Sequence, residues 1–149
     1  MARRPRSELP GAGYFHVTSR GVDRCRIALD DDDYALLVKR LRIGFARERM
    51  VCHAYCVMPN HFHVILDGAM EQVSKAMHYA NGTYALPFNR RHERTGHLFG
   101  DRFYARVLRD DEHLSSACTY VWNNPVRAGL CLEAHEWPWS GRMLRRPGA

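Results

Sequence analysis

The sequence lacks paired cysteines. Five cysteines occur among its 149 residues, an odd number, and no two of them form a C-x-x-C pair. This pattern argues against the disulfide framework of a small secreted domain and against a structural zinc ribbon. We therefore expect reduced thiols that lie mostly in the protein interior.

Long hydrophobic runs are also absent. No apolar run approaches the roughly 20 residues that a membrane-spanning helix needs. The first residues, MARRPRSELPG, contain no hydrophobic signal core. We expect a cytoplasmic protein with no membrane partner.

Lysine is nearly missing as well. The sequence holds 20 arginines against 2 lysines, with a formal net charge of +6. A basic balance favours a polyanionic partner, and the planar fork of arginine suits phosphates and guanine edges. The codon bias of a GC-rich genome would give the same excess of arginine, so composition alone leaves both explanations open.

The chain has the length of one domain with its own core. Residues 1–13 read as a flexible basic arm that contains Arg3 and Arg4. Residues 14–140 are the expected domain, and 141–149 read as a basic tail.

The apolar pattern predicts four strands and three helices. The expected strands cover 14–20, 51–57, 61–66 and 102–108, and the expected helices cover 30–50, 71–89 and 110–123. The second and third strands form a hairpin through Met58-Pro59-Asn60. This order predicts an α+β ferredoxin-like sandwich, a four-stranded and mainly antiparallel sheet with helices packed on it.

Two histidines interrupt the apolar run MPNHFHVIL. Side chains alternate across a strand, so His61 and His63 share one face while Phe62, Val64 and Leu66 share the other. The apolar set indicates the core face, and the histidines point away from it. Imidazoles at i and i+2 can converge on one divalent metal ion, although a metal-free pair of half-buried histidines fits the same pattern.

The short hairpin link predicts the register of the second and third strands. It pairs Val57 with His61 and Tyr55 with His63. This register would place Tyr55 and His53 on the same face as the two histidines.

The segment YVWNN places Tyr120 and Asn124 four residues apart, on one face of the last helix. A carboxamide oxygen is a hard ligand suited to Mg²⁺ or Mn²⁺, and a tyrosine hydroxyl can serve as a nucleophile. A core tyrosine in an amphipathic helix is the other interpretation of Tyr120.

Three blocks occur in order along the chain: HAYCVMPNHFHVIL, NRRHERTGHLFGDRF and YVWNNPVRAGL. With them the sequence resembles the REP-associated tyrosine transposases, which are single-tyrosine HUH transposases (His, hydrophobic residue, His). The resemblance extends from about residue 14 to residue 139. It departs at Trp122-Asn123, where family members commonly carry a His-Leu-like pair, and this leaves Asn123 as a rival amide.

The resemblance implies a DNA transposase or endonuclease that cleaves and rejoins single-stranded DNA near hairpins or repeats, through a 5′-phosphotyrosine intermediate. Tyr120 matches the nucleophile, and His61, His63 and Asn124 match the ligands of a divalent ion, Mg²⁺ or Mn²⁺. The enzyme would be a monomer or a homodimer.

Arginines with interleaved aromatic residues predict the DNA-binding surface. The candidates are Arg90, Arg91, Arg94, Arg102, Arg106, Arg3 and Arg4. Two alternatives remain open at this point: a catalytically inactive single-stranded nucleic-acid-binding protein, and a metal-dependent hydrolase that uses water in place of tyrosine.

Overall fold

The computed structural model describes residues 11–100 and 102–143, which form one five-stranded antiparallel sheet in the order β4-β1-β3-β2-β5. The strands are β1 (Ala12–Arg20), β2 (Cys52–Val57), β3 (His61–Ala69), β4 (Tyr104–Leu108) and β5 (Ser140–Met143). The helices are α1 (Asp31–Arg47), α2 (Met70–Arg91), α3 (Asp111–Trp122) and α4 (Asn124–Arg127), with 3₁₀ turns η2 (Val22–Arg24) and η3 (Ala134–Glu136). The α+β ferredoxin-like prediction is confirmed.

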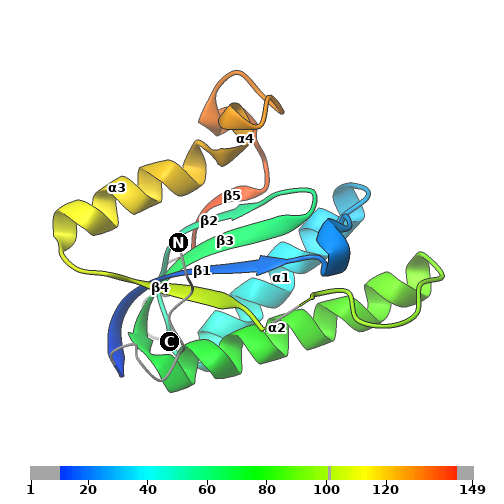
Figure 1. The fold of residues 1–149 in the computed structure, drawn as a ribbon, viewed down its shortest axis with the longest axis horizontal. Coiled ribbons are helices and arrows are strands. Elements are labelled where there is room, and N and C mark those ends of the chain that lie inside the picture. The colour runs from blue at the N-terminus through cyan, green and yellow to red at the C-terminus, as the bar shows by residue number, and fades with distance from the viewer. Residues whose placement is uncertain (1–10, 101, 144–149) are drawn as a thin grey trace.

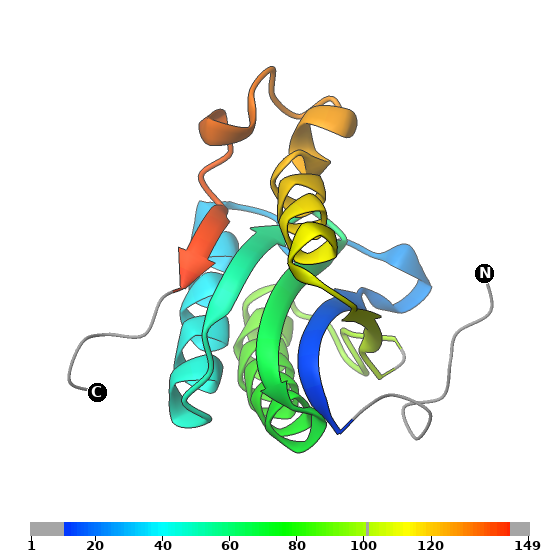
Figure 2. The same ribbon diagram turned by 90° about the vertical axis from the view of Figure 1, so that its left-hand side faces the viewer.

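Helices cover both faces of the sheet. Figures 1 and 2 show α1 and α2 side by side against one face, while α3 lies across the other. Within the described residues, no helix is long and apolar enough to cross a membrane.

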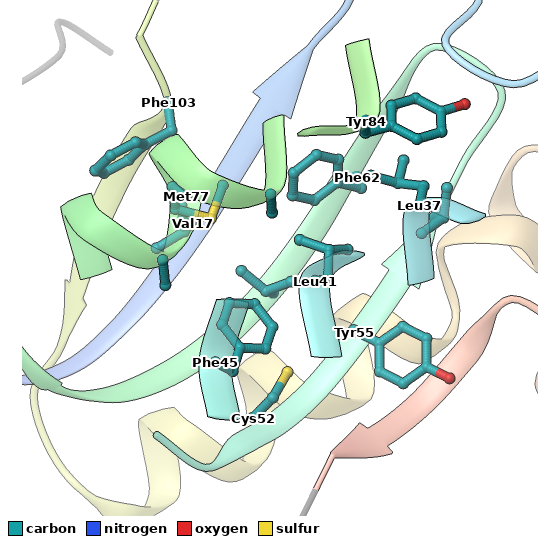
Figure 3. Packing of buried hydrophobic residues seen from close by; sticks show 14 of the residues in the cluster. Val17, Leu37, Leu41, Phe45, Cys52, Tyr55, Phe62, Met77, Tyr84 and Phe103 are labelled. Carbon is teal, nitrogen blue, oxygen red and sulfur yellow. The ribbon is translucent and has the colours of Figure 1, made fainter. Parts of the chain in front are cut away.

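The α1 and α2 side holds the main core. Helix α1 begins at Asp30, whose carboxylate accepts a hydrogen bond from the N–H of Asp33, and its first turn is acidic as the helix dipole favours. Leu37, Leu41 and Phe45 follow at helical spacing and are fully buried against the sheet (Figure 3). Strand β3 lies in the middle of the sheet, between β1 and β2, and its apolar face packs in the same core as α1 and α2.

A fifth strand lies beyond the four that we predicted. Strand β5 pairs with β2 and includes residues 141–143, which we expected in the basic tail. Two tryptophans hold the preceding segment in place: the indole N–H of Trp137 donates to the carbonyl of Val57 over 2.9 Å, and Trp139 stacks on Tyr34 with ring centroids 5.4 Å apart. These partners lie about 80 and 105 residues earlier in the chain, so the contacts that place β5 cannot be read from neighbouring residues. The strand itself has only four residues, too few for a recognisable alternating pattern.

The predicted hairpin register is wrong by one residue. Cys56, not Tyr55, lies opposite His63, and Val57 lies opposite Phe62, because the turn spans 58–61 and is closed by the N–H of Met58 on the carbonyl of His61. A one-residue slip exchanges the faces of a strand. Tyr55 therefore packs into the core under α1, as Figure 3 shows.

His53 nevertheless lies on the face that we expected. A bulge between residues 52 and 54 resets the alternation of β2. The His53 ring lies 5.6 Å from that of Tyr14, which packs on the α3 side of the sheet.

Candidate active site

Strand β3 presents its two histidines to the side of the sheet that α3 covers. Phe62, Val64 and Leu66 are fully buried on the opposite face, as the alternation predicted. The rings of His61 and His63 are nearly perpendicular, at 89°, with centroids 4.9 Å apart. Because β3 is the central strand, both imidazoles are attached to a rigid part of the fold.

The imidazole of His63 is held by two residues of the neighbouring strand β1. Its Nδ1 lies 2.9 Å from Nε2 of His16 and 3.1 Å from Oγ1 of Thr18. When the proton of the His63 ring is on Nδ1, His16 Nε2 and Thr18 Oγ1 can both accept a hydrogen bond from it. The other ring nitrogen, Nε2, then carries a lone pair that can bind a metal ion. Among the described residues, that Nε2 has no hydrogen-bond partner.

His61 has an equivalent arrangement. Its Nδ1 lies 2.6 Å from Oδ1 of Asn60, an oxygen that can only accept, so Nδ1 carries the proton. Nε2 of His61 therefore also keeps a free lone pair. Ligand histidines in metal sites are fixed in this way by a partner on the nitrogen that does not bind the metal.

Burial keeps these imidazoles neutral. Desolvation lowers the pKa of His61 and of His16 to about 4, and it lowers the pKa of His63 to about 2 with help from the neighbouring His16. Metal binding requires the neutral imidazole. At neutral pH both β3 histidines are in the form that can bind a metal ion.

Tyr120 extends from α3 toward the same place. Its ring centroid lies 6.3 Å from those of His16 and His63, and 51% of the residue is exposed. Its helix neighbours Ala117 and Val121 are buried against the sheet. The core interpretation of Tyr120 is thus excluded by its exposure, and the tyrosine approaches the histidines of its own chain.

Asn124 is the first residue of α4, just after α3 ends. Its side chain is half-buried, and its Nδ2 atom is buried without a hydrogen-bond partner among the described residues. Asn123, the rival amide, forms the C-cap of α3, and its backbone N–H donates to the carbonyl of Thr119 over 3.0 Å. The unpartnered atom is the amide nitrogen, which binds no cation, so a divalent ion would need the Oδ1 atom of Asn124 together with the free imidazole nitrogens of His61 and His63.

A cleft of about 780 Å³ opens beside Tyr120, between β1, β4 and α3. Its lining combines aromatic and imidazole rings with exposed arginines. The principal lining residues are His16, His63, His113, Tyr120, Arg20, Arg24, Arg102 and Arg106. Such a basic cleft with a tyrosine hydroxyl can bind a phosphate backbone beside a nucleophile.

Two of the cleft arginines were not predicted from the sequence. Arg20 shares the even-numbered face of β1 with His16 and Thr18, so the period-two pattern of that strand could have identified it. Arg24 had no such signal, because it is placed by a turn in which Asp23 and Arg24 both have positive φ, 50° and 59°.

The other predicted arginines lie elsewhere. Arg91 forms ion pairs of 2.5 Å with Asp30 and 2.8 Å with Asp33, and Arg94 donates to Oδ1 of Asn89 over 2.8 Å. Neither they nor Arg90 line the cleft. Arg3 and Arg4 lie outside the described residues.

Asp30, Asp33 and His92 also come close enough to hold a cation, with ligand atoms within 4.8 Å of one another. The guanidinium of Arg91 already lies between the two carboxylates, and Nε2 of His92 lies 2.8 Å from Asp33. This group ties the start of α1 to the end of α2 and supplies its own positive charge. We therefore interpret it as a structural ion-pair network.

Comparisons with known proteins agree with the motifs. The family described as Transposase IS200 like matches residues 13–124. A Haemophilus influenzae protein described as a REP-associated tyrosine transposase is 28% identical over an alignment of 98 residues that covers 58% of this chain and 56% of that protein. The chain thus spans about half the length of this curated relative.

Solved structures share the fold. A REP-associated tyrosine transposase bound to a REP hairpin has a TM-score of 0.67 at 18% identity, over 94% of this chain and 82% of that one. A Deinococcus radiodurans protein described as a transposase has a TM-score of 0.52 at 16% identity, over 82% and 97%. The resemblance inferred from the three sequence blocks is confirmed, and the chain belongs to the IS200-like transposase family.

Proposed function

We propose that this chain is a metal-dependent tyrosine DNA strand transferase that cleaves and rejoins single-stranded DNA, with Tyr120 as the nucleophile. The observation that carries the proposal is the approach of Tyr120 to His63 at the end of an arginine-lined cleft. A plain hydrolase has no need of an exposed tyrosine at this point. A binding module has no need of two half-buried imidazoles with free Nε2 atoms.

His61, His63 and Asn124 would hold the divalent ion, Mg²⁺ or Mn²⁺. When bound, such an ion polarises a phosphate oxygen as a Lewis acid. The protein contributes rigid ligands, since both Nδ1 atoms are fixed by neighbours. Both imidazoles are half-buried, and partial desolvation keeps them neutral and able to bind the ion.

Tyr120 performs the covalent step. Its phenolic oxygen attacks the scissile phosphorus and loses its proton to solvent or a base, while the bond from phosphorus to the 3′ oxygen breaks and that oxygen takes up a proton from solvent. The products are a 5′-phosphotyrosine and a free 3′-hydroxyl. One phosphodiester bond replaces another, so the 3′-hydroxyl of the same or another strand can reverse the reaction.

The cleft arginines orient the strand. Arg102 and Arg106, from β4 and the residues before it, line the cleft together with Arg20 and Arg24, from the end of β1 and the turn after it. Guanidinium groups on both walls would contact successive backbone phosphates and make binding depend on salt. Because a structurally similar transposase was solved with a REP hairpin, we propose DNA hairpins with single-stranded flanks as the substrate.

The test uses labelled hairpin oligonucleotides with single-stranded flanks, incubated with Mg²⁺ or Mn²⁺ and resolved on denaturing gels. Wild type should form a covalent adduct that EDTA prevents. Tyr120→Phe keeps the ring and the fold but loses the hydroxyl, so it should bind DNA and form no adduct. An adduct in Tyr120→Phe would move the nucleophile elsewhere. Cleavage without an adduct would indicate a hydrolase, and tight binding without any cleavage would indicate a binding protein.

A further inference from the structure

Arg127 lies seven residues after the nucleophile, beyond the break between α3 and α4. Helix α3 ends at Trp122, and Pro125, which has no N–H to donate, is buried near the start of α4. The N–H of Arg127 bonds to the carbonyl of Asn123 over 3.0 Å, so Arg127 lies one helical turn beyond the C-cap of α3. The Arg127 side chain can therefore turn back toward the last turns of α3.

Two contacts join Arg127 to Tyr120. Its guanidinium lies over the phenol ring, with Cζ 3.9 Å from the ring centroid. Its Nη2 atom also donates a hydrogen bond of 2.7 Å to the Tyr120 carbonyl. One guanidinium thus restrains both the backbone and the ring of the same residue.

Capping of a helix end explains only half of this arrangement. Arginines near a helix C-terminus commonly bond the last carbonyls, and this accounts for the 2.7 Å contact. A cap does not require the guanidinium to cover an aromatic face. An exposed tyrosine would otherwise exchange among staggered rotamers, most of which carry the hydroxyl away from the histidines.

We propose that Arg127 is a positioning residue that holds the Tyr120 ring at the mouth of the cleft, facing His16 and His63. The guanidinium covers one face of the ring, and the two imidazoles approach it edge-on at 64° and 84°. This inference rests on the proposed role of Tyr120 and adds the residue that fixes the position of its hydroxyl.

The chain offers a matched control. Arg142 also lies over an aromatic ring of α3, that of Trp122, at 5.1 Å from its centroid. Both arginines are exposed, so Arg127→Ala and Arg142→Ala remove the same charge and the same kind of contact. Only Arg127→Ala releases the nucleophile.

The experiment measures single-turnover adduct formation at saturating hairpin DNA. We expect Arg127→Ala to react about tenfold or more slowly than Arg142→Ala, since a misplacement of about 1 Å can cost on the order of 100-fold in rate. DNA affinity and melting temperature should match those of Arg142→Ala. Arg127→Lys keeps the charge but loses the planar fork, so it should remain slow.

A rate for Arg127→Ala within twofold of Arg142→Ala would overturn the proposal. Full recovery in Arg127→Lys would also overturn it, because charge alone would then suffice. A loss of affinity with an unchanged rate at saturation would make Arg127 a DNA contact instead.

A second readout does not depend on activity. In protein labelled with ¹³C-tyrosine, the ring signals of Tyr120 are assigned by their loss in Tyr120→Phe. Arg127→Ala should shift them toward values of a freely rotating tyrosine, and Arg142→Ala should not. Unchanged signals would overturn the proposal. If wild type forms no adduct, the proposed function fails while the spectra still test Arg127.

Discussion

The His16→Ala variant tests how the fold prepares His63 for a metal ion. His16 supplies the closer of the two partners of Nδ1 on His63, at 2.9 Å, and Thr18 supplies the other at 3.1 Å. Loss of such an outer partner typically weakens metal binding by about 10- to 100-fold. Because Thr18 remains, we expect His16→Ala to weaken Mn²⁺ binding by about tenfold, near the low end of this range.

The double variant His16→Ala, Thr18→Val removes both partners and should approach about 100-fold. Free Mn²⁺ is measured by electron paramagnetic resonance during titration of the DNA-free protein. His53→Ala is the control, since this imidazole lies on the same sheet face but pairs with Asp67 at 3.0 Å. Melting curves identify any variant that fails to fold, because His16 is buried.

The reasoning is refuted if the single and double variants bind Mn²⁺ within twofold of His53→Ala. In that case the orientation of His63 would come from β3 alone. If His63→Ala nevertheless lost Mn²⁺ binding, His63 would be a ligand of the ion, but His16 and Thr18 would not contribute to the affinity.

Three further predictions concern assembly, stability and pH. Because Tyr120 approaches His63 of its own chain, a mixture of the two inactive variants Tyr120→Phe and His63→Ala should form no covalent adduct on denaturing gels. An adduct in the mixture would mean that the tyrosine of one chain works with the histidines of another. Asp33→Ala removes the buried partner of Arg91. Because the Asp33 side chain is 3% exposed and that of Arg91 is 42% exposed, we expect the free energy of unfolding in urea to fall by about 2–3 kcal/mol, less than the full cost of breaking a buried pair. A loss under about 0.5 kcal/mol, which is typical of a surface change, would contradict this. The pKa of His61 is lowered from 6.5 to about 4, so the unfolded chain binds its proton first, and the free energy of unfolding should fall as pH drops from 6.5 toward 4. His16 and His63 contribute to the same slope, so His61→Ala should reduce it in urea titrations at each pH, and an unchanged slope would contradict this.

The sequence determined the features that depend on neighbours along the chain. The apolar periodicity gave the strands and helices of the sandwich, and period-two alternation directed His61 and His63 away from the Phe62 face. The helical spacing of the last block predicted Tyr120 and Asn124 on one face of a single helix, whereas the structure ends α3 at Trp122 and begins α4 at Asn124. These features follow from local backbone geometry, which adjacent residues encode.

Only the tertiary structure decided which side chains meet. His16 lies 47 residues from His63, and Arg24 reaches the cleft through a turn with positive φ that no residue pattern announced. The hairpin register was wrong because Met58, which we expected in the link, bonds to His61, and this shift by one residue exchanged Tyr55 and Cys56 between the faces of β2. Cross-strand partners depend on register, bulges and turn length, and each of these can change by one residue without altering the local pattern that the sequence displays.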